Sequence, residues 1–263
     1  MLDLAKMTPA QVRQEIREGR LAIPTAGMAQ GHIQANLAIM PKDLAYDFLL
    51  FAQRNPKPCP ILDVTDPGDP EPKFMAPGAD LRYDIPKYRI YKQGKMVDEV
   101  LNLENYWRDD LVAFLIGCSF SFETALLKAG VPVRHIEEKC NVPMYITNIA
   151  CRSAGRFAGP TVVSMRPIPE NQVVRAVQVT SRFPSVHGAP LHIGNPAGIG
   201  IKDVHKPDFG DAVTIRPGEV PVFWACGVTP QAVAMECKPD LMITHAPGHM
   251  LICDPQDEDL AVL

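Results

Sequence analysis

The sequence predicts an α/β protein in which a three-layer α/β core domain carries a smaller inserted two-layer α/β domain. Residues 219–231 hold a nearly continuous apolar run, a Cys-Gly break and then Thr-Pro, which is typical of a buried strand that leads into a helix. Residues 111–129 repeat this pattern. Residues 141–216, between the two patterns, have strand and helix signals of their own. We therefore expect residues 1–140 plus 217–263 to form the core domain and residues 141–216 the insert.

The N-terminal part predicts two helices separated by a glycine-rich segment. Thr8-Pro9 has the cap and proline that begin a helix, and Gly19 offers a left-handed stop. Residues 24–41 mix glycines, amides and one histidine, so we expect a loop followed by a short apolar element. Asp43 is the expected cap of a second helix, which Asn55-Pro56 ends.

The next elements alternate between strands and turns. A short buried strand is expected at 61–64, and a hairpin with a Gln93-Gly94 turn is expected within 80–101. The insert should contain strands at 142–148, 161–165 and 190–193, with a helix after Pro169. A last strand at 241–244 leads into a segment with two histidines.

Composition excludes several classes of partner. The net charge is -4, and the Lys and Arg residues are scattered, so we expect neither nucleic acid nor a membrane as partner. The seven cysteines are an odd number without CxxC spacing, and no signal peptide is visible, which predicts reduced thiols in a cytoplasmic protein. The glycine patterns do not fit the loops that bind nucleotides. Pro247 and Gly248 prevent the helix that would place His245 and His249 on one face as a pair of metal ligands. We therefore expect no cofactor and no metal.

Several long motifs resemble those of one protein family, the D-glutamate cyclases, whose bacterial members are described as hydro-lyases. The motifs are Gln34-Ala-Asn36, Asn55-Pro-Lys-Pro-Cys-Pro60, Gly117-Cys-Ser-Phe-Ser-Phe-Glu123, Asn141-Val-Pro-Met-Tyr145, Ser164-Met-Arg-Pro167, His187-Gly-Ala-Pro190, Phe223-Trp-Ala-Cys-Gly-Val-Thr-Pro-Gln231 and Thr244-His-Ala-Pro-Gly-His-Met250. The resemblance covers nearly the whole chain. It implies a core α/β domain with a smaller insert, and the closure of D-glutamate to 5-oxo-D-proline with loss of water.

Such a dehydrative ring closure needs a grip on carboxylates, a base for the amine and donors for the departing oxygen. The helix N-termini after Cys118 and Cys226 can present N–H groups to a carboxylate. Arg166 and Arg182 could recognise a second carboxylate through their forked guanidinium groups. The substrate-binding candidates are Ser119, Ser121, Asn141, Tyr145, Arg166, Arg182, His187, Thr229 and Gln231. The expected partner is thus a small-molecule carboxylate, and a homodimer is left open.

The catalytic candidates lie in the two cysteine turns and the late histidine segment. They are Cys118, Glu123, Cys226, His245 and His249. A thiol at a helix N-terminus should have a lowered pKa. Paired cysteines across a cleft could also exchange a Cα proton, so a cofactor-independent racemase or epimerase is one alternative. A protein that only binds a small organic acid is the other.

Overall fold

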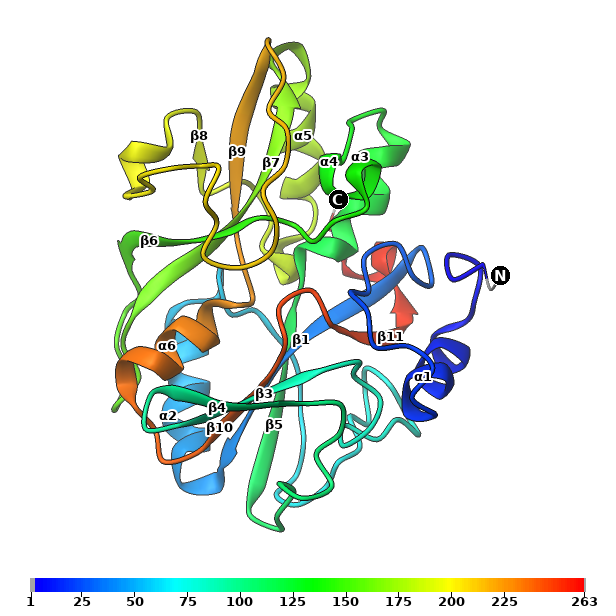
Figure 1. Ribbon diagram of the computed structural model, residues 1–263, viewed down its shortest axis with the longest axis vertical. Coiled ribbons are helices and arrows are strands. Elements are labelled where there is room, and N and C mark those ends of the chain that lie inside the picture. Colours follow the sequence, from blue (N-terminus) through cyan, green and yellow to red (C-terminus); the bar gives the residue numbers. More distant parts are fainter. Residues whose placement is uncertain (1–2, 263) are drawn as a thin grey trace.

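The computed structural model describes residues 3–262 and shows an α/β protein built on two separate sheets (Figure 1). The strands are β1 (His32–Pro41), β2 (Ile61–Val64), β3 (Tyr88–Lys92), β4 (Lys95–Val100), β5 (Leu111–Gly117), β6 (Met144–Ala150), β7 (Pro160–Pro169), β8 (His192–Ile193), β9 (Glu219–Ala225), β10 (Met242–His245) and β11 (Leu251–Gln256). The α-helices are α1 (Pro9–Arg17), α2 (Lys42–Arg54), α3 (Glu123–Lys128), α4 (Arg134–Glu138), α5 (Val173–Ser181) and α6 (Thr229–Cys237). Short 3-10 helices are η1 (Ser119–Phe122), η2 (Glu170–Gln172), η3 (Pro184–Val186), η4 (Pro196–Ile199) and η5 (Asp257–Leu260). The predicted α/β class is confirmed.

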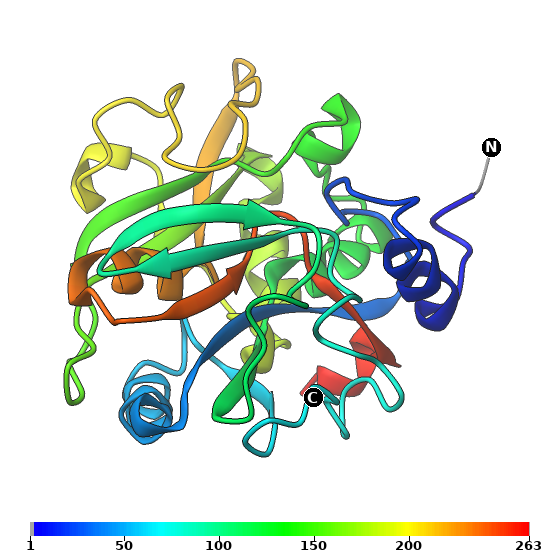
Figure 2. The ribbon, with the colours of Figure 1, turned by 60° about the horizontal axis from the view of Figure 1, so that its bottom comes forward.

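The larger sheet has seven strands in the order β2-β5-β1-β10-β3-β4, with β11 also paired to β1. β1 is the central strand, although the sequence predicted only a short apolar element there. Side chains of α2 and α6 pack on one face of the sheet, and the loop that contains Met75, Leu81 and Ile85 covers the other. Figure 2 shows the predicted hairpin of β3 and β4 beside β10, at one edge of this sheet.

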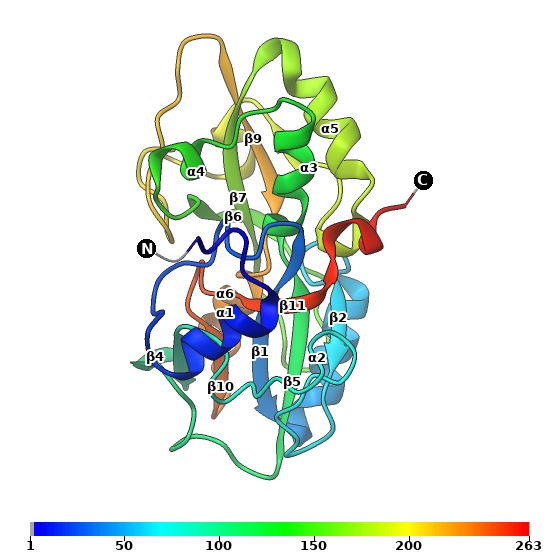
Figure 3. The same ribbon diagram turned by 90° about the vertical axis from the view of Figure 1, so that its right-hand side faces the viewer.

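The smaller sheet has four strands in the order β6-β7-β9-β8. Helices α3 and α5 lie on one of its faces (Figure 3), where Phe122, Ala176 and Trp224 are buried together. The segment around Ile199 and Val213 covers the opposite face. β9 begins after residue 216, the expected end of the insert, and pairs with β7 and β8 in this sheet. The expected domain boundaries remain a prediction.

The N-terminal cap agrees with the sequence prediction in one helix, α1, and differs from it in three, α2, η1 and α6. Helix α1 begins after Thr8 as predicted, with a full capping box. Helix α2 begins at Lys42 after Pro41, so Asp43 lies inside the first turn and is not its cap. Cys118, and neither of the two serines, caps η1 through its sulfur. Thr229 is the first residue of α6 and not its cap, because its hydroxyl donates to the Cys226 carbonyl and accepts from the Val162 N–H.

Candidate active site

The two cysteine turns come from different sheets and meet at the junction between them. β5, which leads to Cys118, belongs to the larger sheet, and β9, which leads to Cys226, belongs to the smaller one. Both cysteines are buried in one cluster with Phe120, Val162 and Met250. The fold therefore unites two turns that lie about a hundred residues apart in the sequence.

Both thiols are neutral at physiological pH. Burial raises the pKa of Cys118 well above its usual value, and burial also raises the pKa of Cys226 to about 11. The expectation of lowered thiol pKa values is wrong. A helix N-terminus favours thiolate only when burial does not cost more than the terminal N–H groups contribute, and these side chains are only 3% and 6% exposed. The two cysteines therefore keep their protons in this state.

A buried guanidinium lies beside the thiols, at the centre of a polar network. Arg166, on β7, has no exposed surface, and its Nε donates to Oε1 of Glu123 at 3.0 Å. Its two terminal nitrogens donate to the hydroxyls of Ser164 and Ser119, at 3.1 and 3.0 Å. The guanidinium also lies over the Trp224 ring, 5.5 Å from its centre. Arg166, Glu123 and Ser119, three predicted site residues, are therefore in direct contact.

Glu123 connects this network to His135. Its Oε1 lies 3.0 Å from Nε2 of His135, in addition to its contacts with Arg166. Burial alone would raise the pKa of Glu123, but the attraction of His135 and Arg166 outweighs it and lowers the pKa below the usual value. Glu123 is therefore an ionised carboxylate that fixes the position of Arg166.

Two amide side chains pack directly on glycines at the same junction. Asn36, on β1, donates from Nδ2 to the Gly117 carbonyl at 2.7 Å and lies where a Cβ on Gly227 would be. Asn141 donates from Nδ2 to the Pro247 carbonyl at 3.0 Å and lies where a Cβ on Gly248 would be. The Oδ1 atoms of both asparagines are buried and have no hydrogen-bond partner within residues 3–262.

The two late histidines have different surroundings. His245 is fully buried, and its Nδ1 accepts from the Leu37 N–H at 3.1 Å, which fixes the ring against β1. Nothing in the described part of the chain forms a hydrogen bond with its Nε2. Burial lowers the pKa of His245 to about 3, so the ring is neutral. His249 lines a surface hollow of about 380 Å³ with Lys87, Arg89 and Asn141. The late segment reaches the thiol cluster through Met250.

The other hydroxyl and amide candidates, Ser121, Thr229 and Gln231, form hydrogen bonds that connect the elements around the junction. Ser121 accepts from the Gln34 N–H through Oγ at 3.0 Å, and Thr229 ties the Cys226 turn to β7. Gln231 accepts from the Tyr91 hydroxyl at 3.1 Å and donates to the His245 carbonyl at 2.8 Å. These side chains hold the elements that carry the thiols.

Of the three remaining candidates, Tyr145 and Arg182 face away from the thiol cluster, whereas His187 lies close enough to Arg166 for that guanidinium to contribute to the lowering of its pKa. Tyr145 faces the opposite side of the smaller sheet and donates to the Val204 carbonyl at 2.5 Å. Arg182 is exposed at the end of α5, where its Nε donates to the Val262 carbonyl at 3.4 Å. His187 is buried beside the Lys57 carbonyl, which contacts its Nδ1 at 2.8 Å, and burial lowers its pKa to about 4.

Sequence reasoning missed several groups that the structure adds to the site. His135 lies in a short charged helix that resembles a solvated surface segment, so no pattern marked it. Asn36 and Gln34 were visible only within a family motif. Asp257 lies in the acidic run that ends the chain, which is typical of an exposed tail. It is nevertheless buried and lines a pocket with Glu123.

Within residues 3–262, no group of three or more His, Cys, Asp or Glu side chains is arranged to hold a metal ion. None of the helices in that range has the length and apolar character that a membrane crossing requires. The seven cysteines are all free thiols.

Comparisons with known proteins agree on one family. The family model described as D-glutamate cyclase matches residues 112–254. A protein of Psychrobacter arcticus named "Putative hydro-lyase" is 68% identical over 263 residues, which cover 100% of both chains. The hydro-lyase relative YcsI of Bacillus subtilis carries the same description and is 66% identical over 98% of this chain and 100% of its own.

A relative from Geobacillus kaustophilus, with the same description, is 66% identical over 98% of both chains. A crystal structure of a nitrogen repressor-like protein from Methanococcus jannaschii overlaps with a TM-score of 0.37 at 11% identity, over 89% of this chain and 91% of its own, which is too low a similarity to support an argument. The family match and the full-length relatives together show that this chain belongs to the D-glutamate cyclase family.

Proposed function

We propose that this protein is a hydro-lyase that acts on a small acidic substrate, and that it closes D-glutamate to 5-oxo-D-proline with loss of water. Membership of the D-glutamate cyclase family supports the class of reaction. The observation that carries the proposal is the buried Arg166 network, whose guanidinium is close enough to the two neutral thiols to influence both pKa values. A buried guanidinium suits a carboxylate ligand, and neutral thiols suit proton donation.

The reaction requires a simple balance of atoms. The amine nitrogen forms a bond to the γ-carboxyl carbon, and one carbon–oxygen bond of that carboxyl group breaks. The two protons that the ammonium nitrogen gives up leave with the departing oxygen as water. The enzyme must therefore remove protons from nitrogen, add protons to oxygen and hold the α-carboxylate still.

In this proposal Arg166 holds the α-carboxylate. Its terminal nitrogens now donate to the neutral hydroxyls of Ser119 and Ser164, and a carboxylate would replace them as a stronger, charged acceptor. Glu123 keeps the guanidinium in place. Cys118 and Cys226 would protonate or stabilise the departing oxygen, because both retain their protons at neutral pH.

The racemase alternative needs one thiolate and one thiol at the same time. Since burial raises the pKa of both cysteines, the resting site favours the protonated pair and gives the racemase less support. A non-catalytic binding protein remains the second alternative, because the same guanidinium could hold an organic acid without converting it.

The purified protein should be incubated with D-glutamate and followed by ¹H NMR in H₂O and in D₂O, with L-glutamate as the stereochemical control. We expect resonances of 5-oxo-D-proline to appear. Deuterium at Cα of an open-chain product would show the racemase instead. Thermal stabilisation by D-glutamate without turnover would show the binding protein. The absence of both turnover and stabilisation would overturn the proposal.

Replacing Arg166 by lysine tests the proposed carboxylate grip. Lysine keeps the positive charge but loses the fork, so we expect kcat/KM for D-glutamate to fall by roughly 10²-fold or more. The matched control is Arg175→Gln, which removes an exposed arginine on α5 that donates to the Ala129 carbonyl. Unchanged kcat/KM in a folded R166K protein would remove Arg166 from the proposed mechanism.

A further inference from the structure

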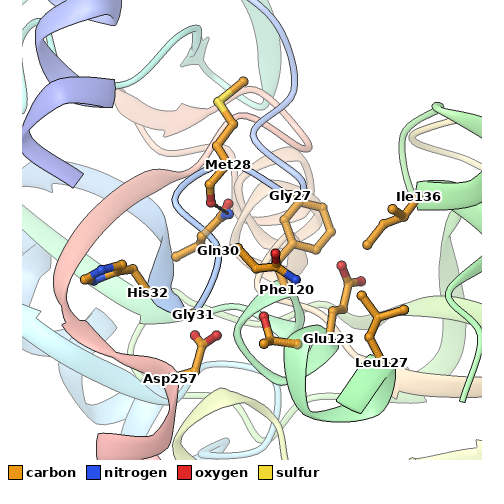
Figure 4. Close-up of a pocket in the computed structure, with 12 residues that line it drawn as sticks. Gly27, Met28, Gln30, Gly31, His32, Phe120, Glu123, Leu127, Ile136 and Asp257 are labelled. Atoms are coloured by element: carbon orange, nitrogen blue, oxygen red, sulfur yellow. Dashed lines mark hydrogen bonds between the residues drawn. The ribbon is translucent and has the colours of Figure 1, made fainter. Parts of the chain in front are cut away.

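A small pocket is lined by Glu123, the same side chain that contacts Arg166. It is formed by the loop at 27–31, the start of β1, η1 with α3, and η5. The cavity measures about 30 Å³, which is room for one or two water-sized groups. Figure 4 shows the carboxyl groups of Glu123 and Asp257 on its walls, from α3 and η5 respectively.

The pocket contains two buried side-chain oxygen atoms for which residues 3–262 supply no hydrogen-bond partner. Gln34 and Asp257 both line it, and each is 4% exposed. Among the residues that the structure describes, neither Oε1 of Gln34 nor Oδ1 of Asp257, both buried, has a hydrogen-bond partner. The Gln34 amide cannot turn to present its nitrogen, because Nε2 donates to the Thr25 carbonyl at 3.0 Å. A buried polar atom without a partner is costly, so the Gln34 oxygen, together with Asp257 in its ionised form, suits a ligand that donates N–H or O–H groups.

The charge of the pocket depends on whether the Asp257 carboxyl group is protonated. Burial raises its pKa to about 8, so it is mostly protonated at neutral pH. Thr124 and Lys128 of α3 lower this pKa, whereas Glu258 of η5 and Glu123 raise it. His32 of β1 also lines the pocket. A cation in the pocket would favour the ionised Asp257 and release its proton.

We propose that this pocket is a subsite for a primary ammonium group, held by N–H donation to the Gln34 amide oxygen and the Asp257 carboxylate. An ammonium group is about as large as water, donates up to three hydrogen bonds and carries the charge that an ionised aspartate balances. Water could donate to the same oxygens, but it would not ionise Asp257.

The identity of the ligand rests on the proposed function. Oε1 of Glu123 contacts Arg166, and the same side chain lines the pocket. If the ammonium group of an α-amino acid occupies this pocket, Glu123 is the side chain that lies both at the pocket and against Arg166, the proposed carboxylate site. The ionised Asp257 would then be the base that takes a proton from the amine before ring closure.

The subsite can be tested with ammonium chloride alone, independently of catalysis. Protein labelled with ¹³C at the aspartate carboxyl carbons is titrated with pH, and the Asp257 signal is assigned as the one that Asp257→Asn removes. We expect saturating ammonium chloride to lower the pKa of Asp257 by about one unit or more. Tetramethylammonium chloride, which has the same charge without N–H donors, should leave it unchanged.

Variants separate the pocket from general salt effects. Gln34→Met removes the amide oxygen while nearly keeping the shape of the side chain, so we expect a weaker response to ammonium. Glu258→Gln is the matched control, because Glu258 is the exposed neighbour of Asp257 on η5, and its response should be retained. An unchanged Asp257 signal in ammonium chloride, or an equal response to potassium chloride, would overturn the ammonium assignment.

Binding of D-glutamate and of glutarate tests the subsite separately from the proposed function. Glutarate has both carboxylates of D-glutamate without the amine, so D-glutamate should bind the wild-type protein more tightly, and Asp257→Asn should reduce that preference by roughly 10-fold or more. If ammonium binds but D-glutamate does not, the proposed function fails and the subsite stands. If D-glutamate is converted but ammonium leaves Asp257 unchanged, the subsite fails and the function stands.

Discussion

At the scale of single residues, the junction between the two sheets depends on a side chain that packs where any residue other than glycine would have its Cβ. Gly227 follows Cys226 directly, and the Asn36 amide occupies the space where its Cβ would lie. The same amide donates to the Gly117 carbonyl, just before Cys118. One asparagine therefore contacts both cysteine turns, and the distance between the turns depends on its close approach to glycine.

Gly227→Ala should destabilise the protein, because the new methyl group overlaps a buried amide that has little room to move. We expect the free energy of unfolding in urea to fall by ~1–3 kcal/mol. Asn36→Ala by itself should also lower the free energy of unfolding, since it removes the hydrogen bond to Gly117. When Gly227→Ala is added to Asn36→Ala, however, the further loss should be clearly smaller than the loss that Gly227→Ala causes in the wild-type protein. Additive effects of the two substitutions would contradict the proposed contact.

At the scale of elements, helix α6 fastens the smaller sheet to the larger one. The helix follows β9 of the smaller sheet, and it packs on the face of the larger sheet through Val233 and Ala234. Gln231 in its first turn bridges β3 and β10 through the Tyr91 hydroxyl and the His245 carbonyl. The strand and helix of this unit were predicted from the sequence, but its attachment to two sheets was not.

Gln231→Leu tests this bridge. Leucine leaves the buried Tyr91 hydroxyl without its acceptor and removes one of the two side-chain donors to the His245 carbonyl, which keeps the Thr244 hydroxyl, so we expect a loss of ~1–3 kcal/mol of unfolding free energy. Tyr91→Phe removes only one of the two hydrogen bonds and is the graded control, with a loss of ~1 kcal/mol. Equal losses in the two variants, measured by chemical denaturation, would argue against a bridge made by both bonds.

At the scale of the whole molecule, the buried ionisable groups set how stability depends on pH. His187 and His245 are neutral in the folded protein because burial lowers their pKa values to about 4 and about 3, from 6.5. The unfolded chain therefore binds more protons between pH 4 and 6.5, and stability falls as the pH falls through this range. Asp257 has the opposite sign, since its pKa rises from 3.8 to about 8 and its contribution is lost as the pH rises toward 8.

The free energy of unfolding should thus have its maximum near pH 6.5. Below it, the two histidines outweigh the one aspartate and give a net loss of up to ~1.4 kcal/mol per pH unit. Between pH 6.5 and 8, Asp257 alone gives a decline of similar slope. Urea unfolding across pH 4.5–8 measures the curve. Asp257→Asn should abolish the decline on the alkaline side, and a decline that persists in this variant would show that Asp257 is not its source.

Much of the local structure could be predicted from the sequence. The hairpin at Gln93-Gly94, the helix after Thr8 and the strand at 61–64 follow from turn, cap and apolar signals that act over a few residues. β1 was missed as a long strand because Gln34 and Asn36 interrupt its apolar pattern. Those amides are buried at the junction, where they contact the Thr25 and Gly117 carbonyls, and no local signal reports such distant partners. Dimer formation remains a prediction.

The sequence by itself determined the α/β class, the two strand–cysteine–helix turns and the family, since short-range propensity and long motifs carry that information. Only the tertiary structure decided which side chains meet. It placed Arg166 on Glu123, paired Glu123 with His135, and buried Asp257 of the acidic C-terminal run. It also reversed the expected direction of the thiol pKa values. The physical reason is that burial and charge pairing depend on long-range contacts, which residue spacing does not encode.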